Sequence, residues 1–287
     1  MASSNSEILK ILTGKISHIF PFNKHSTDWF HNFEKLHDLY ISEFRLKMEE
    51  GSRTSAGILS YLEEISANVE KVLDIPCGIG RISKDLLSRG MDVTGVDISK
   101  HFLDEFRHIS GRLGNSGKLD LVNATFKEFM PPVAGEKYDL MINWWTSFGY
   151  SSYQDDVEFF RNLKQLSHGN TVLMVETWHR DYIAGHKMRF TYKDLGRISV
   201  VNENLFQDNC SSVYTTHSYY EKSGNDLKFR DRFDSSIRLY SKDQLLDLMK
   251  EAGWEVIDIF NNIETRQPFN YANDRIVLIL KPAGSQS

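Results

Sequence analysis

The sequence predicts an α/β fold: a Rossmann-like, seven-stranded and mostly parallel sheet with helices on both faces, an N-terminal helical cap and an antiparallel β insertion after strand five. Two observations predict it. Between residues 72 and 176, short apolar strands alternate with helical patterns, which is typical of a parallel sheet covered by helices. After Trp178 several strand patterns follow one another directly, which is typical of an antiparallel sheet.

The N-terminal helical cap is predicted over residues 1–66. Residues 1–28 carry a short amphipathic pattern with lysines on its other faces, which favours a packed segment over a membrane anchor. Apolar side chains then recur at spacings of three and four, and a second helix is expected from about Ser55 to Ile65. This spacing is typical of helices that pack one face against a core.

The core of the fold is predicted over residues 67–185. Its strands are expected at Val72–Ile75, Val93–Asp97, Leu119–Asn123, Tyr138–Asn143 and Thr171–Glu176. Helices are expected from about Ile82, Lys100 and Asp155. This alternation favours parallel strands with helices on both faces of the sheet.

The antiparallel insertion is predicted over residues 186–240, as a platform for a substrate or for a dimer. Its strands are expected at Lys187–Tyr192, Ser199–Phe206, Ser212–Lys222 and Leu227–Leu239, with a hairpin turn between the last two. Period-two alternation from Val213 to Tyr219 indicates a sheet with one solvated face.

Residues 241–287 are predicted to complete the core. Ser241 is expected as the N-cap of a helix that runs to Ala252, and Gly253 is expected to end it. Two further strands, Trp254–Phe260 and Arg275–Leu280, are expected to form a closing antiparallel hairpin.

A glycine-rich turn after the first strand predicts a nucleoside site. Gly78 and Gly80 lack a Cβ atom, so the backbone can take a positive φ and approach a ligand closely. The second strand ends in Asp97, whose carboxylate can accept both hydroxyls of a ribose. A nicotinamide fingerprint needs a third glycine where this chain has Ser83, so dinucleotide binding is the weaker interpretation.

These residues, with Asp74 ahead of the turn, resemble the first two motifs of the class I S-adenosylmethionine (SAM)-dependent methyltransferases. The run Ser147–Tyr150 and the insertion resemble the small-molecule subgroup that includes amino-sugar N,N-dimethyltransferases, so the resemblance covers roughly residues 30–281. Pro76 departs from the family pattern, which usually has a glycine there. The resemblance implies SAM as the cofactor, S-adenosylhomocysteine as its product, and in-line transfer of a methyl group to a nitrogen or oxygen of a small polar molecule.

The resemblance also implies a set of cofactor-binding residues at the strand ends. They are Asp74, Cys77, Gly78, Gly80, Arg81, Asp97, Ile98, Asn123, Ala124, Thr125, Phe126, Asn143 and Trp144. Arg81 can either donate to the methionine carboxylate of SAM or be a solvated residue at a helix start. The acidic residue that the family usually carries after strand three is absent here, where the run begins with Asn123.

Aromatic residues that follow strands four and five are the candidates for binding the methyl acceptor. They are Trp145, Phe148, Tyr150 and Trp178, and one of the two adjacent tryptophans can equally be a core residue.

Two residues are candidates for catalysis. His179 is expected to act as a base or to orient the acceptor, because its charge changes near working pH. Tyr40 matches a tyrosine-containing lid of the subgroup, although its helical spacing suits core packing equally well. In the insertion, His217, Tyr219 and Tyr220 suit either a substrate pocket or a dimer surface.

Composition narrows the partners and the compartment. A net charge of −5 offers no general attraction for phosphate backbones, so nucleic acid is an unlikely partner. Cys77 and Cys210 are too few for a disulfide framework, and no apolar run is long enough for a membrane span, so a cytoplasmic protein is expected. No metal site is predicted. The alternatives to a small-molecule enzyme are an RNA or protein methyltransferase and a non-catalytic SAM-binding regulatory protein.

Overall fold

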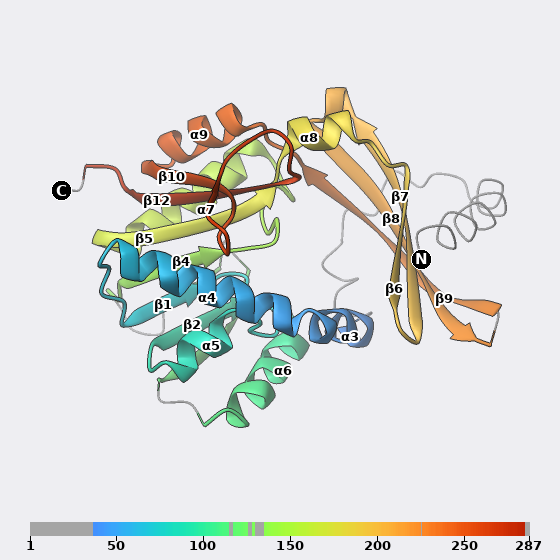
Figure 1. The fold of residues 1–287 in the computed structure, drawn as a ribbon, viewed down its shortest axis with the longest axis horizontal. Helices are drawn as coiled ribbons and strands as arrows, with labels where there is room; N and C mark the ends of the chain where they lie inside the picture. The colour runs from blue at the N-terminus through green and yellow to red at the C-terminus, as the bar shows by residue number, and fades with distance from the viewer. Residues whose placement is uncertain (1–36, 115–116, 126–127, 130–134, 225, 285–287) are drawn as a thin grey trace.

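The protein folds around two β-sheets. The computed structural model describes residues 37–114, 117–125, 128–129, 135–224 and 226–284. The central sheet has the strand order β11-β10-β12-β5-β4-β1-β2-β3, and the second sheet has the order β6-β7-β8-β9 (Figure 1). The N-terminal pattern over residues 1–28 lies outside the described residues.

Among the described residues, the predicted helices and strands occur in their predicted order, with one additional short α-helix after strand five and one additional two-residue strand at the sheet edge. The α-helices are α3 (His37–Leu46), α4 (Met48–Glu64), α5 (Ser83–Ser88), α6 (Lys100–Gly111), α7 (Tyr153–Gln165), α8 (Arg180–Gly185) and α9 (Lys242–Glu251). The central strands are β1 (Lys71–Asp74), β2 (Asp92–Asp97), β3 (Leu119–Asn123), β4 (Tyr138–Asn143), β5 (Ser167–Trp178), β10 (Trp254–Asn262), β11 (Gln267–Pro268) and β12 (Arg275–Pro282). The strands of the second sheet are β6 (Phe190–Leu195), β7 (Ile198–Gln207), β8 (Ser212–Ser223) and β9 (Asp226–Arg238).

The central sheet is parallel from β3 to β5 and antiparallel beyond it, where β12 pairs with β5 and with β10. The predicted count of seven strands is wrong by one, because the two-residue strand β11 adds to the edge. The register of β10 shifts between Phe260 and Asn262, and the chain turns back there to pair β11 with β10. A two-residue pairing has no periodic side-chain pattern, so the sequence gives no sign of it.

Helices cover both faces of the central sheet, because successive strand residues point to opposite sides. Leu140 and Ile142 of β4 pack with α4, α5 and α6 on one face. Met141, between them, packs with α7 and α9 on the other face. This arrangement leaves the carboxyl ends of β1, β2, β4 and β5 as the edge where loops meet.

Serine N-caps fix where three helices begin. Ser241 caps α9 through a capping box with Gln244, and Gly253, with a φ of +87°, follows the last turn, which confirms both predictions. Ser152 caps α7 in the same way. Ser99 accepts from the Phe102 amide and starts α6 directly after β2, which holds the end of that strand in place.

The predicted insertion forms the second sheet, which lies between α8 and α9 along the chain. Strand β6 begins at Phe190, three residues after the predicted start, because residues 187–189 form a loop after α8. Helix α3 contacts β6, and the second sheet stands beside the helix-covered core at the α3 end (Figure 1). Apolar side chains of α3, α6, β7, β8 and β9 form a shared cluster there.

The cap helices described here are α3 and α4, and α4 begins at Met48, earlier than the predicted Ser55. No helix among the described residues is long and apolar enough to cross a membrane.

Candidate active site

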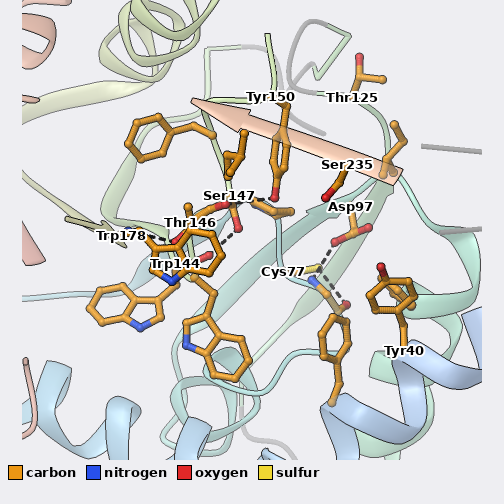
Figure 2. A pocket seen from close by; sticks show the side chains of 18 of the residues that line it. Tyr40, Cys77, Asp97, Thr125, Trp144, Thr146, Ser147, Tyr150, Trp178 and Ser235 are labelled. Atoms are coloured by element: carbon orange, nitrogen blue, oxygen red, sulfur yellow. Dashed lines mark hydrogen bonds between the residues drawn. The ribbon is translucent and has the colours of Figure 1, made fainter. Parts of the chain in front are cut away.

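A cavity of about 600 Å³ lies where the carboxyl ends of the central strands face the second sheet (Figure 2). That volume is in the range of small-molecule and cofactor sites. Figure 2 shows Trp144 and Trp178 on one side of the cavity, and Asp97, Cys77 and Tyr40 on the other. Open α/β sheets bind ligands at this edge, because it is where the strand order reverses and the loops diverge.

The two glycines of the turn have different surroundings. Gly78 lines the cavity with a φ of +55°, and a Cβ atom built on it would meet only a Phe44 ring carbon, at 4.0 Å. Gly80 does not line the cavity, although it was predicted to bind the cofactor. A Cβ atom on Gly80 would lie 2.2 Å from the Phe106 ring, so this glycine is needed for the packing of α6 against the turn.

Asp97 is held at the cavity wall by backbone amides. Its Oδ2 atom accepts from the Gly78 amide at 2.8 Å, and its Oδ1 atom accepts from the Ser99 amide at 2.9 Å. The carboxylate is buried, and these bonds give it one orientation. Ile98 and Cys77 line the cavity beside it.

Asp74 and Arg81 lie at the base of the cavity. Burial raises the pKa of Asp74 to about 7, opposed by a hydrogen bond from Ser83 and supported by the nearby charge of Asp97. The Arg81 guanidinium lies over the rings of Trp145 and Phe44. Its Nη1 atom is buried and has no hydrogen-bond partner among the described residues. A cationic donor in that state is suited to a carboxylate ligand.

Fewer of the residues at the end of β3 line the cavity than the sequence predicts. Ala124 and Thr125 line the cavity, and Phe126 lies outside the described residues. Asn123 does not line it. Its Nδ2 atom donates to the carbonyl oxygens of Asp97 and Ile98, so it holds the end of β3 against the end of β2.

Two residues in the left-handed region shape the exit of β4. Trp145 and Thr146 have φ values of +63° and +55°. Glu176 holds them, since its Oε2 atom accepts from the Trp145 amide at 2.9 Å and its carbonyl accepts from the Thr146 amide at 3.1 Å. Arg275 donates to Thr146 Oγ1 and pairs with Glu176, each at 2.9 Å. These hydrogen bonds and the ion pair hold the backbone in its left-handed conformation, as is typical of functional sites.

The tryptophans on this turn both reach the cavity. Trp144 is buried and Trp145 half-buried, and both line it. Asn143 does not line it, because its Nδ2 atom donates to the Ile75 carbonyl at 2.8 Å and ties β4 to β1. The sequence did not identify Arg275 as a residue of the site.

The remaining aromatic candidates line the cavity to different extents. Phe148 is buried and stacks on Tyr240, so most of its ring belongs to the core. The Tyr150 hydroxyl donates to the Thr146 carbonyl at 3.0 Å, and burial raises its pKa. Trp178 lines the cavity beside Arg275.

The structure separates the two catalytic candidates. His179 is fully buried outside the cavity, packs against Phe269 and Tyr271, and lies 3.6 Å from Asp181. Because side chains alternate along a strand, Trp178 faces the cavity while the next residue faces away from it. His179 is therefore not brought together with the other candidates.

Tyr40 does lie in the cavity wall, where its ring contacts Tyr219 and Phe233 of the second sheet. Burial, with the neighbouring Tyr219 and Glu43, raises its pKa well above the usual value. Tyr40 thus packs in an aromatic cluster and lines the cavity at once.

The second sheet forms one wall of the cavity. The sequence indicated either a substrate pocket or a dimer surface for this sheet. Its lining residues are Lys193, Val200, Thr215, His217, Tyr219, Phe233, Ser235 and Ile237. Tyr220 points elsewhere and contacts Phe229. The period-two alternation from Val213 to Tyr219 was the available signal, but it does not say which face meets the central sheet.

Comparison with known proteins agrees with this site. Residues 72–168 match the family model of a methyltransferase domain. No curated protein matches the chain. A solved SAM-dependent methyltransferase from Clostridium acetobutylicum is 18% identical, with a TM-score of 0.73, over 88% of this chain and 99% of its own.

Two further solved structures share the fold. CalS10, an amino pentose methyltransferase from Micromonospora echinaspora solved with SAM bound, is 11% identical, with a TM-score of 0.64, over 85% of this chain and 97% of its own. KedS8, a sugar N-methyltransferase from Streptoalloteichus, is 15% identical, with a TM-score of 0.59, over 85% of this chain and 92% of its own. At these identities the neighbours establish the fold alone, whereas the domain match carries the activity. The chain contains a methyltransferase domain and is an enzyme that uses S-adenosylmethionine as its cofactor.

Proposed function

We propose that this enzyme methylates an amine on a small polar molecule. The observation that carries the proposal is that one continuous cavity of about 600 Å³ is lined both by the strand ends of the methyltransferase domain and by the second sheet. That volume suits a cofactor together with a small acceptor. Hydroxyl methylation is the closest alternative, and the likeness to the sugar N-methyltransferase KedS8 and to the amino pentose methyltransferase CalS10 favours nitrogen.

We assign the donor half of the cavity to the residues around the glycine turn. Asp97 is placed to accept the ribose hydroxyls, with Gly78 giving close access and Ala124 and Thr125 beside the base. Arg81, with its buried Nη1 atom, is placed to donate to the methionine carboxylate. The orphaned donor and the open space at Gly78 are the features that fit the cofactor.

When bound, SAM supplies an activated methyl group on a positively charged sulfur. The protein residues around it have positioning tasks. The rings of Trp144 and Tyr40 are oriented to exclude water and to favour a cation over their faces, whereas the face of Trp145 is occupied by the Arg81 guanidinium. A strong base is needed only where the acceptor arrives protonated, and no step here depends on His179.

The donor assignment is tested by calorimetric binding of SAM and S-adenosylhomocysteine to the wild type and to Asp97→Ala. Asp92→Ala is the matched control, because Asp92 lies at the other end of β2, where its Oδ1 atom accepts from the Lys118 amide. Affinity is expected to fall at least about tenfold, or roughly 1.4 kcal/mol, in Asp97→Ala alone. Equal losses in the two variants would contradict the assignment.

The acceptor class is tested by methyl transfer from radiolabelled SAM to a panel of amino sugars, free and as nucleoside diphosphate conjugates, each paired with its hydroxyl analogue. Preferential labelling of the amines is expected. Labelling only of RNA or protein would replace the proposal by the macromolecular alternative. Tight SAM binding without transfer to any acceptor would favour a non-catalytic binding protein.

A further inference from the structure

The wall that the second sheet contributes carries two hydroxyl groups side by side. Thr215 of β8 and Ser235 of β9 are register partners, and both line the cavity. Directly paired residues on one face of an antiparallel sheet have their Cβ atoms about 4.5–5.5 Å apart. Figure 2 shows Ser235 among the side chains around the cavity. The direction in which each hydroxyl hydrogen points decides what these groups can bind.

The Thr215 hydrogen points away from the cavity. Asn204 of β7 donates from Nδ2 to the Met188 carbonyl at 2.9 Å, and because a carbonyl only accepts, this bond fixes which way the amide faces. The Oδ1 atom of Asn204 therefore faces β8 and accepts from Thr215 Oγ1 at 2.9 Å. With its hydrogen used in this bond, Thr215 offers the cavity only lone pairs.

The direction of the Ser235 hydrogen follows from the tautomer of His217, which the orientation of the Asn202 amide selects. Asn202 donates from Nδ2 to Thr191 Oγ1 at 3.1 Å, which leaves its Oδ1 atom facing His217 Nδ1 at 2.9 Å. With the Asn202 amide in this orientation, its oxygen accepts from Nδ1 of His217, so Nδ1 carries the hydrogen and Nε2 of the neutral ring is the acceptor. Ser235 Oγ lies 2.9 Å from Nε2 and donates to it.

His217 is held as a neutral ring. The ring stacks on Phe233 with centroids 4.4 Å apart, which fixes its plane. Burial and the charge of Lys193 lower the pKa of His217 to about 3, with Glu43 acting in the opposite direction. The ring therefore remains an acceptor for Ser235 at neutral pH, and Ser235 also offers the cavity only lone pairs.

We propose that Thr215 and Ser235 form a two-acceptor subsite that binds an amino group of the methyl acceptor through two N–H donors. A hydroxyl group has one hydrogen and can satisfy only one of the two oxygens, whereas a primary amine can satisfy both. An amine held by two N–H bonds directs its lone pair away from this wall and into the cavity. The inference rests on the proposed function and makes Asn202, Asn204 and His217 positioning residues.

The subsite is tested by steady-state kinetics on the amino sugar panel with Ser235→Ala, Thr215→Val and the double variant. The matched controls are Ser236→Ala and Thr216→Val, which change the neighbouring side chains on the opposite face of the same strands. In the double variant, KM for the amine is expected to rise at least tenfold, while the Kd for SAM stays within twofold. Ser235→Thr, which keeps the hydroxyl, is expected to retain a KM near that of the wild type.

An unchanged KM in the double variant, with normal transfer by the wild type, overturns the subsite and leaves the proposed function standing. Absence of amine methylation by a wild type that binds SAM overturns the proposed function, and the amine subsite with it.

The hydrogen-bond direction is tested separately, without any acceptor. Two-bond proton–nitrogen correlation spectra of the ¹⁵N-histidine-labelled protein report which nitrogen of His217 carries the hydrogen, with His217→Asn identifying the signal. The Nδ1–H form is expected. An Nε2–H form would point the ring hydrogen at Ser235, free the serine to donate, and overturn the acceptor-only subsite.

Discussion

The two ends of the cavity are built by different means. At the donor end, backbone amides from turns after β1 and β2 hold Asp97, and positive φ angles shape the exits. At the second sheet, side chains of β7, β8 and β9 form a chain of hydrogen bonds that runs from Asn202 through His217 to Ser235. The first kind of site depends on glycines and caps at fixed spacing, and the second depends on the register of a sheet.

The largest expected effect comes from the glycine turn, where Gly80→Ala is compared with Gly78→Ala. A methyl group on Gly80 clashes with the Phe106 ring and the φ of +73° is strained for alanine, so a loss of about 3–5 kcal/mol of stability is expected. Gly78→Ala meets open space and is expected to cost only about 1 kcal/mol of stability, from its positive φ.

Urea unfolding measures both stabilities, and calorimetry measures SAM affinity in Gly78→Ala, which is expected to fall because the added methyl group points into the donor half of the cavity. Equal stability losses in the two variants would contradict the assignment of Gly80 to packing and of Gly78 to cofactor binding.

This division marks how far the sequence could predict the site. The motif predicted the same role for Gly78 and Gly80, because both are glycines of the same turn. Only the packing of α6 brings Phe106 against Gly80, and the motif does not contain that information. Asn123 shows a similar limit: it follows a strand at the right edge of the sheet, but it does not line the cavity, and its Nδ2 atom joins two strand ends. Alternating strands and helices predicted the fold, since burial on two faces imposes that pattern.

Residues brought in by topology could not be predicted. Arg275 starts a strand far along the chain and reaches the cavity because β12 pairs with β5, where it lies opposite Trp178. Asn202 and Asn204 matter through their partners on β8, and that register is not visible in either strand alone. The domain boundaries and a dimer through the second sheet stay predictions.

The next largest effect is the pH dependence contributed by Asp74 at the donor end. Burial raises its pKa to about 7, so the folded state holds a proton that the unfolded state releases near pH 4. Stability from this group is present below about pH 4 and is lost as the pH rises towards 7. The stability of Asp74→Asn relative to the wild type is expected to rise by about 2–4 kcal/mol over that range, measured by urea unfolding. Parallel stability curves would contradict the raised pKa.

The second sheet is expected to respond to pH in the opposite direction, through His217. Its lowered pKa means that the unfolded state takes up a proton near pH 6.5 while the folded state does not until about pH 3. Stability is therefore present above pH 6.5 and is lost as the pH falls. Relative to the wild type, His217→Asn is expected to gain about 2 kcal/mol between pH 7 and pH 4, after allowance for partial exposure. If the stability difference between His217→Asn and the wild type does not change with pH, His217 is in contact with solvent in the folded protein.

The smallest effect concerns the ion pair that joins α3 to the second sheet. Lys193 of β6 lies 2.8 Å from Glu43, a buried carboxylate that Lys47 also approaches, at 3.3 Å. Burial acts to raise the pKa of Glu43, but the two lysines outweigh it and lower the pKa. Lys193→Met keeps the aliphatic length and leaves Lys47 in place, so a stability loss of about 1 kcal/mol is expected from urea unfolding.

The matched control for this pair is Lys222→Met, which removes an exposed pair with Asp194 on the same sheet and is expected to cost less than about 0.5 kcal/mol. Because Glu43, Tyr40 and Lys193 all line the cavity, Lys193→Met also tests whether α3 and the second sheet close the acceptor half together. If they do, KM for the amine rises while the Kd for SAM is unchanged. If the two lysine variants lose the same small amount of stability and KM does not change, α3 and the second sheet are held together by apolar packing alone.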